Sequence, residues 1–197
     1  GYCVITKISF KLSIDKSLKL TCYSGFVTRG IFYGILSDIS EELANYIHSA
    51  KTIAPYSCSP MYILNDKGGT SVIYNKIPSG KVCFDVVLLG ETLTKVFTDV
   101  NSLRKLCNSK IRVHSYTATI DSFSMEIVDL NSLKCSEPCT KFRVDFISPT
   151  FFKKPCPYIP KRHIRESQMK LLGKPKSVVY LYPDPCFMFN NIIRVWR

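Results

Sequence analysis

The sequence predicts an α+β protein. We expect a ferredoxin-like (RRM-like) βαββαβ domain over residues 1–135, followed by the basic, truncated start of a second ferredoxin-like domain over 136–197. Segments with alternating apolar residues and segments with helical apolar spacing follow one another in the order strand, helix, strands, helix, strand. A new alternating segment then begins at Lys141, and too little chain follows it to complete a second unit.

The first strand and two helices are expected within residues 4–49. Residues 4–14 alternate loosely and contain β-branched side chains, as strands do. Apolar residues recur at helical spacing within 28–39, which predicts a helix. Ser40 is expected to cap a second short helix that ends near His48, because two glutamates occupy its first turn, where the helix dipole favours carboxylates.

The rest of the first domain is expected to consist of strands and one further helix. Residues 55–65 predict an edge strand because they contain two prolines, and residues 66–69 predict a turn. A helix at 91–105 should place Leu93, Val96, Phe97 and Val100 on one apolar side. Further strands are expected at 70–77, 81–89, 110–120 and 123–130.

The second unit is expected to begin with a strand and end with a helix. Residues 141–150 alternate aromatic or aliphatic with charged side chains, as a first strand should. A loop rich in proline and lysine follows, and residues 184–197 predict a helix. We therefore interpret residues 136–197 as half of a domain.

Composition excludes several classes of protein. With 197 residues and 46% hydrophobic side chains, the chain can bury a core and is not disordered. No apolar run approaches the ~18–20 residues of a membrane span, and the N-terminus lacks a signal peptide's apolar core. The nine scattered cysteines predict reduced thiols in a cytoplasmic protein. Cys135 and Cys139 lack further ligands at zinc spacing, so no metal and no cofactor are expected.

Positive charge is concentrated in the last third of the chain. Residues 1–140 contain 15 basic and 12 acidic side chains, whereas residues 141–197 contain 12 basic and 3 acidic ones. A polyanion is the natural partner of such a field, and nucleic acid comes first because no basic amphipathic helix indicates a membrane anchor. A basic protein that is merely soluble is the simpler alternative.

Three segments, taken in order, resemble the CRISPR-associated repeat-RNA endoribonucleases. The first is RGIFYGILSDISEELANYIHSAK followed by PYSCSP, in which Leu43, Ile47 and His48 match the end of the family's second short helix. The second is VDFISPTFF, which is similar to the segment that opens the family's second ferredoxin-like domain. The third, FNNIIRVW, is similar to the helix that follows. Family members also carry a glycine-rich loop near the C-terminus, whereas this chain has only Gly173 after Gly90.

The resemblance implies metal-independent cleavage of CRISPR repeat precursor RNA to guide RNAs, with attack by the 2′-OH and a cyclic phosphate product. It assigns the catalytic roles to Tyr33, His48 and Lys51. Each has a simpler explanation: a histidine at a helix end can be a surface or capping residue, a tyrosine can fill a helix–sheet interface, and a lysine can be a solvated loop residue.

The basic segment is expected to bind RNA that is single-stranded or weakly structured. No association of the protein with a membrane is expected. Cations and aromatic rings are interspersed there, which suits phosphates and unstacked bases. Two alternatives stay open: a non-catalytic RNA-binding protein of the same fold, and a subunit of a larger ribonucleoprotein such as a CRISPR effector complex. The RNA-binding candidates are Lys153, Lys154, Lys161, Arg162 and Arg165.

Overall fold

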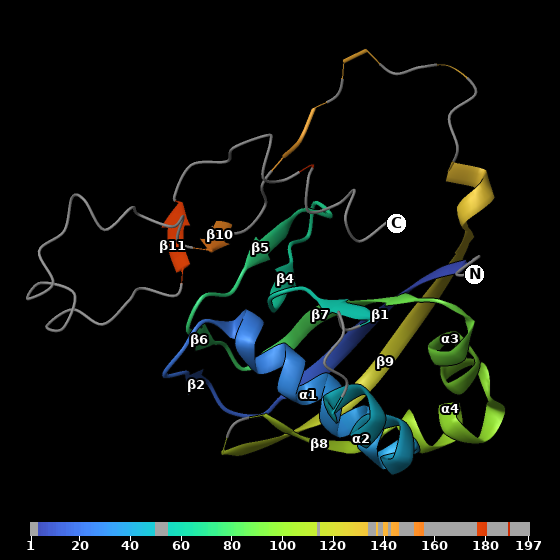
Figure 1. Ribbon diagram of the computed structural model, residues 1–197. Helices are drawn as coiled ribbons and strands as arrows, with labels where there is room; N and C mark the ends of the chain where they lie inside the picture. The colour runs from blue at the N-terminus through green and yellow to red at the C-terminus, as the bar shows by residue number, and fades with distance from the viewer. Residues whose placement is uncertain are drawn as a thin grey trace, which may run out of the picture. The chain divides into compact units, whose positions relative to one another are not determined.

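The protein combines an antiparallel sheet with helices, as the computed structural model shows (Figure 1). The structure describes residues 4–49, 55–113, 115–133, 137, 140–141, 143–145, 152–155, 177–180 and 189. The chain divides into two compact units, Gly1–Thr140 and Lys141–Arg197. No helix among the described residues is both long and apolar enough to cross a membrane.

Seven strands form one sheet within the described part of the first unit, in the order β5-β4-β7-β1-β9-β8, with β3 also paired to β7. Strand β1 lies between β7 and β9, and all of its pairings are antiparallel. This is the strand order of a βαββαβ domain, and it confirms the predicted fold class. The strands are β1 (Val4–Ile14), β3 (Tyr56–Cys58), β4 (Tyr62–Leu64), β5 (Thr70–Val72), β7 (Gly80–Leu89), β8 (Lys110–Val113) and β9 (Tyr116–Asp129).

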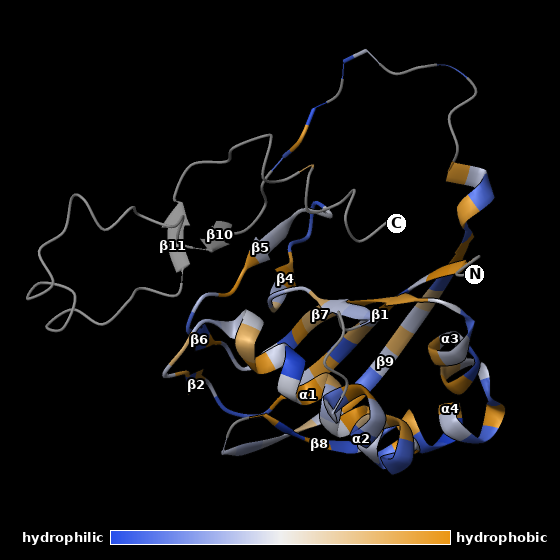
Figure 2. Cartoon of the chain, in the orientation of Figure 1, coloured by the Kyte–Doolittle hydropathy of each residue, from blue (hydrophilic) through white to orange (hydrophobic). Residues whose placement is uncertain are grey.

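Four helices among the described residues contribute buried side chains to the core, and α1 and α3 contact the sheet directly: α1 (Ser24–Ile39), α2 (Glu41–Ser49), α3 (Glu91–Thr98) and α4 (Val100–Leu106). Hydrophobic and hydrophilic residues alternate along them, as Figure 2 shows, because each helix has one buried side. The ring of Phe32 on α1 stacks on Phe97 of α3 at a centroid distance of 5.7 Å. Aromatic packing thus joins α1 to α3 over the sheet.

The predictions for residues 4–14, for the second short helix and for residues 81–89 are confirmed. On β7 every second side chain from Val82 to Leu88 is buried, as the alternation predicts. The hydroxyl of Ser40 accepts the backbone N–H of Leu43 at 3.4 Å, so Ser40 caps α2. Helix α1 begins at Ser24, four residues before the predicted start.

The prediction of a single helix at 91–105 is wrong, because the helix is interrupted at Asp99. Asp99 has an extended backbone (φ −66°, ψ 127°) and its carboxylate accepts the N–H of Ser102 at 3.0 Å, capping α4. A side chain that caps competes with helix continuation. Val100 is consequently 60% exposed and lies outside the apolar side where the spacing placed it.

Three predicted strands are divided in the structure. Residues 55–65 form β3 and β4, because Ser59 and Pro60 interrupt the pairing with β7. Residues 70–77 form β5 and β6 (Lys76–Ile77), and β6 pairs with β2 (Leu18–Lys19) in a separate ribbon. Residues 110–120 turn back on themselves as the β8–β9 hairpin, in which Val113 pairs with Tyr116, and β9 then continues through the strand predicted at 123–130.

The second unit contains one described hairpin, β10 (Phe152–Pro155) paired with β11 (Ser177–Tyr180). The strand predicted at 141–150 is wrong at its described residues, 141 and 143–145, which belong to no strand. Alternation alone is insufficient, because a strand needs a neighbour for its backbone groups. Of the helix predicted at 184–197, only Phe189 is described.

Ser59 is the point at which α1, β7 and the segment between β3 and β4 are joined. Its backbone N–H donates to the carbonyl of Asp85 and its hydroxyl accepts the N–H of Asp85, each at 2.8 Å. Its carbonyl accepts the hydroxyl of buried Thr28 on α1 at 2.7 Å. Because Pro60 has no N–H to pair with β7, these bonds replace the interrupted ladder.

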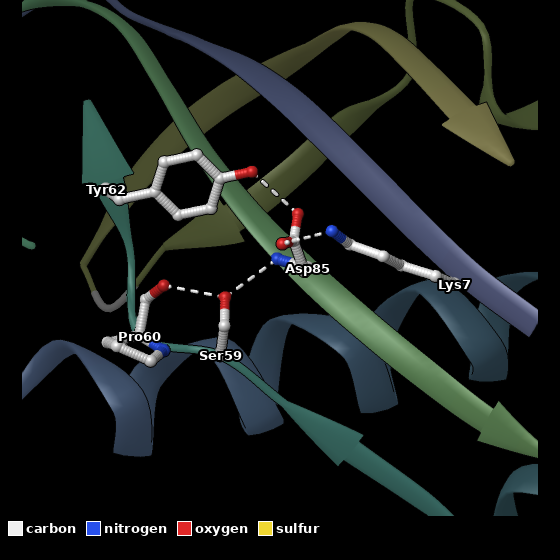
Figure 3. A network of polar contacts seen from close by, with 5 residues as sticks. All are labelled: Lys7, Ser59, Pro60, Tyr62 and Asp85. Atoms are coloured by element: carbon white, nitrogen blue, oxygen red, sulfur yellow. Dashed lines mark hydrogen bonds and ion pairs between the residues drawn. The ribbon is translucent and has the colours of Figure 1, made fainter. Parts of the chain in front are cut away.

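The carboxylate of Asp85 extends this network on the other side of β7 (Figure 3). It accepts the hydroxyl of Tyr62 at 2.7 Å and pairs with the ammonium of Lys7 at 3.3 Å. Burial raises the pKa of Tyr62 above its ordinary value, and the hydrogen bond to Asp85 adds to this, so the hydroxyl remains a donor. The network fixes β4, whose ladder with β7 is a single pair.

A buried pair of hydroxyls joins β1 to α3. The oxygens of Thr6 and Thr94 lie 2.7 Å apart, and both side chains are buried. Thr94 donates its own hydrogen to the carbonyl of Gly90 at 2.9 Å, so Thr6 must be the donor to Thr94. Removing the acceptor would leave a buried donor without a partner.

We expect Thr94→Val to lower the free energy of unfolding by about 1–3 kcal/mol, the cost of an unsatisfied buried hydroxyl. Chemical denaturation measures this. The control Thr98→Val removes an exposed hydroxyl from the same helix and should change stability by less than about 0.5 kcal/mol. The double variant with Thr6→Val should recover part of the loss, since both polar partners are then gone. Equal costs for the two single Thr→Val changes on α3 would contradict the assignment.

A second expectation concerns the ion pair between Lys81 and Asp121, 2.8 Å apart. The hydrogen bond from Lys81 lowers the pKa of Asp121 below its ordinary value of 3.8. Its stabilising contribution is therefore present above the unfolded-state pKa and is lost as pH falls through the folded-state pKa. Titration of the carboxyl group by NMR should show a low midpoint that rises in Lys81→Met. Lys95→Met, which removes the partner of Glu91, should leave it unchanged; a parent midpoint at or above 3.8 would contradict the pair.

Candidate functional site

Two of the three predicted catalytic side chains lie together in the structure. The rings of Tyr33 on α1 and His48 on α2 have centroids 5.3 Å apart and planes inclined at 52°. Tyr33 is half-buried and packs against the core, whereas His48 is exposed in the last turn of α2. Tyr33 thus does fill a helix interface, while its hydroxyl stays at the surface beside the imidazole.

Ser40 brings these two residues together because it links the helices directly. Its backbone N–H donates to the carbonyl of Leu36 and closes the last turn of α1. Its carbonyl accepts the N–H of Ala44 at 3.0 Å and so begins α2. With one residue between the helices, α2 folds back onto α1, and its buried residues Ala44 and Ile47 join the core.

Asn45 completes the described part of the site. The hydroxyl of Tyr33 donates to the amide oxygen of Asn45 at 3.3 Å. Asn45 precedes His48 by three positions on α2, and residues three apart share a helix face. The amide and the imidazole therefore both contact the same phenol. Asn45 was not among the predicted site residues, although its helical spacing from His48 could have indicated it.

The other predicted site residues cannot be added to this pair from the structure. Lys51 lies outside the described residues. Lys153 and Lys154 belong to β10, whose backbone alone is described, and Lys161, Arg162 and Arg165 lie outside the described residues. Their roles remain predictions.

A groove of about 660 Å³ runs beside α1 and has Tyr33 in its wall. Its α1 side extends from Phe26 to Asp38, and its other side is formed by Lys110, Ile111 and Arg112 of β8. The three residues of β8 were not among the predicted site residues. The alternation of buried Ile111 with exposed Lys110 and Arg112 was visible in the sequence, but nothing there indicated that β8 lies next to α1.

The described thiols differ in accessibility. Cys22, Cys58, Cys83 and Cys107 are all free; Cys22 and Cys107 are exposed, and Cys22 lines the groove. Burial raises the pKa of Cys58 to about 12, against the opposing charge of Arg29, and this disfavours the nucleophilic thiolate form. Among the described residues, no three His, Cys, Asp or Glu side chains gather as metal ligands would.

The arrangement can move a proton and orient an oxygen. An exposed imidazole can accept or donate a proton, and a phenol held by an amide acceptor keeps its oxygen at a fixed place. Both groups are needed where a hydroxyl attacks and an alkoxide leaves. Tyr33 lies in the wall of a groove that two cations, Lys110 and Arg112, also line, and this arrangement suits a polyanionic substrate.

No protein-family model matches the sequence, and no curated protein matches it. Among solved structures, a Cas6 product complex matches 98% of this chain with a TM-score of 0.60 and 16% sequence identity. The chain spans 64% of the length of that structure. At this identity the likeness concerns the fold, and we conclude that the protein has a Cas6-like fold.

Proposed function

We propose that the protein is an endoribonuclease that cleaves CRISPR repeat precursor RNA by attack of an RNA 2′-OH, without a metal ion. The observation that carries this proposal is the pairing of Tyr33 with His48 at 5.3 Å, across two helices of a Cas6-like fold. The sequence motifs resemble the repeat-RNA endoribonucleases independently of this geometry. The proposed products are guide RNAs, and an effector ribonucleoprotein is a further proposed partner.

The reaction requires two proton transfers. As the 2′-oxygen bonds to the adjacent phosphorus, its proton passes to a base; as the bond from phosphorus to the 5′-oxygen breaks, that oxygen takes a proton from an acid. The product on one side is a 2′,3′-cyclic phosphate and on the other a 5′-hydroxyl. His48 is proposed to carry one of these protons, because its imidazole is exposed and stands in the last turn of α2.

Tyr33 is proposed to orient the reacting phosphate or the 2′-OH. Its hydroxyl now donates to Asn45 at 3.3 Å, which is a long hydrogen bond that a phosphate oxygen could replace. In the free protein Asn45 is proposed to act as a positioning residue that holds the phenol beside His48 until a phosphate oxygen takes its place. Lys51 is proposed to stabilise the additional negative charge on the phosphate as the 2′-oxygen attacks.

We expect His48→Ala to lower the single-turnover cleavage rate by ~10²–10⁴, the usual share of one general acid or base. RNA affinity should change little, because lysine and arginine contacts with phosphates dominate RNA affinity. Labelled CRISPR repeat RNAs in EDTA provide the assay. The matched control is Ser49→Ala, the next residue on the same exposed helix end, which should cut at the parent rate. Lys51→Ala should lower both rate and affinity.

Cleavage by His48→Ala at the parent rate would overturn the catalytic role. If the parent protein binds repeat RNA tightly but does not cut it, the non-catalytic RNA-binding alternative is the correct one. Because the assay is run in EDTA, activity that appears only when a divalent metal is added would contradict the metal-independent mechanism.

RNA affinity is expected to depend strongly on salt. Residues 141–197 contain 12 basic and 3 acidic side chains. Each phosphate they neutralise releases counterions, so the logarithm of the association constant should fall by ~0.7 per contact for each tenfold increase in salt. Fluorescence anisotropy across a salt series measures the slope. A flat response would overturn nucleic acid as the partner of this segment.

A further inference from the structure

The sheet of the first unit does not offer the surface on which RRM domains stack bases. Such domains project aromatic rings from their two central strands on the side away from the helices. Here the rings of Phe10 and Phe84 stack on each other at 5.0 Å on the helix side, and both are fully buried. On the opposite side, β1 and β7 carry Lys7, Ser9, Lys11, Lys81, Cys83 and Asp85.

The groove beside α1 has the features that the sheet lacks. Phe26 is 67% exposed at one end of it, and its ring makes an edge contact with Tyr23 at 6.4 Å, which limits its freedom. Lys110 and Arg112 line the β8 side. An accessible ring with cations nearby is the combination with which proteins bind single-stranded nucleic acid.

The floor of the groove is open because two glycines lie one helical turn apart. A Cβ atom added to Gly30 or Gly34 would meet nothing within 4 Å, and both residues line the groove. Glycine within a helix is destabilising relative to alanine. Neither position needs glycine for packing inside this chain, so the space above α1 is available to a ligand.

The charge of the groove favours an anion. Two of the residues that line the groove are cations, Lys110 and Arg112, and one is acidic, Asp38, which lies near the opposite end of α1 from Phe26. Charged residues also protect edge strands such as β8 from pairing with other sheets, which is the structural alternative. That alternative accounts for the cations but not for the exposed ring or the open floor.

We propose that single-stranded RNA lies along the groove between α1 and β8, with a base on Phe26 and phosphates at Lys110 and Arg112, leading to the Tyr33–His48 pair. That the groove leads to a reacting phosphate rests on the proposed function. The binding itself does not, because Phe26, Lys110 and Arg112 take no part in the chemistry. Any RNA base can stack on an aromatic ring, so the RNA strand in the groove would be bound through its backbone and the faces of its bases, without regard to sequence.

Footprinting of cysteines tests the location directly. The full-length protein is alkylated with and without a 2′-O-methylated single-stranded oligoribonucleotide, which can bind but cannot cut itself. The modification rate of each thiol is read by mass spectrometry. Cys22 lines the groove and should be protected several-fold, whereas Cys107 is equally free and exposed but lies outside it and should not be. Unprotected Cys22 at saturating RNA would overturn the proposal.

Substitutions separate binding from folding. Gly30→Leu should raise the melting temperature, because leucine is the better helix former, yet weaken binding of the same oligonucleotide about tenfold by filling the floor. Phe26→Ala should weaken binding about tenfold, with exposed Leu64→Ala on β4 as the control. Lys110→Ala should reduce the salt slope by ~0.7, and Lys105→Ala on α4 should not.

The outcomes distinguish this inference from the proposed function. If Gly30→Leu leaves affinity unchanged, the groove is not the RNA path, even where His48→Ala abolishes cleavage. If the parent protein binds no RNA, both proposals fail. If Gly30→Leu leaves RNA affinity unchanged but converts a dimer to a monomer in analytical ultracentrifugation, the glycine face belongs to a second copy of the chain and the RNA path is overturned.

Discussion

The bonding of Ser59 holds the site in place, because it is where helix α1 is tied to the sheet. Hydrophobic contacts bring α1 onto the sheet but allow it to slide, whereas hydrogen bonds have direction. The hydroxyl of Thr28 reaches the carbonyl of Ser59, and Ser59 exchanges two further bonds with Asp85 of β7. Ser24 adds a second tie one turn earlier, since its hydroxyl accepts the N–H of Met61 and donates to the carbonyl of Ile73. The orientation of α1, and with it the position of Tyr33, is therefore set from its N-terminal half.

The other half of the site follows from a single residue. Ser40 ends α1 and begins α2, so the position of His48 is set by α1 rather than by the sheet directly. A change in the direction of α1 would move Tyr33 and His48 together and would leave the distance between their rings unchanged. Such a change would alter the position of Tyr33 and His48 relative to β8, whose cations line the groove. Ser24, Thr28 and Ser59 thus act on the groove more than on the pair.

The sequence carried much of the fold but less of the site. The alternation on β1 and β7 and the cap at Ser40 could be predicted, because each depends on neighbouring residues alone. The break at Asp99 was missed because apolar spacing on both sides of it is helical, and only the capping bond to Ser102 decides against continuation. The division at Ser59–Pro60 depends on a contact with Thr28, 31 positions earlier, which no local pattern contains. For the same reason the distance from Tyr33 to His48 could be suggested by resemblance but not obtained from spacing.

The use of aromatic residues in β1 and β7 explains why the two sides of the sheet differ. Phe10 and Phe84 face the helices, where they build the core together with Phe32 and Phe97. A ring that is buried for stability cannot also stack on a base. On the opposite side of the sheet, Lys7 pairs with Asp85 and Lys81 pairs with Asp121, so these charges largely neutralise one another. The proposed recognition of a polyanion is therefore assigned to the helices rather than to the sheet. There α1 places an exposed ring, two open glycines and the phenol of Tyr33 along one groove, so the helix that closes the core also carries the candidate site.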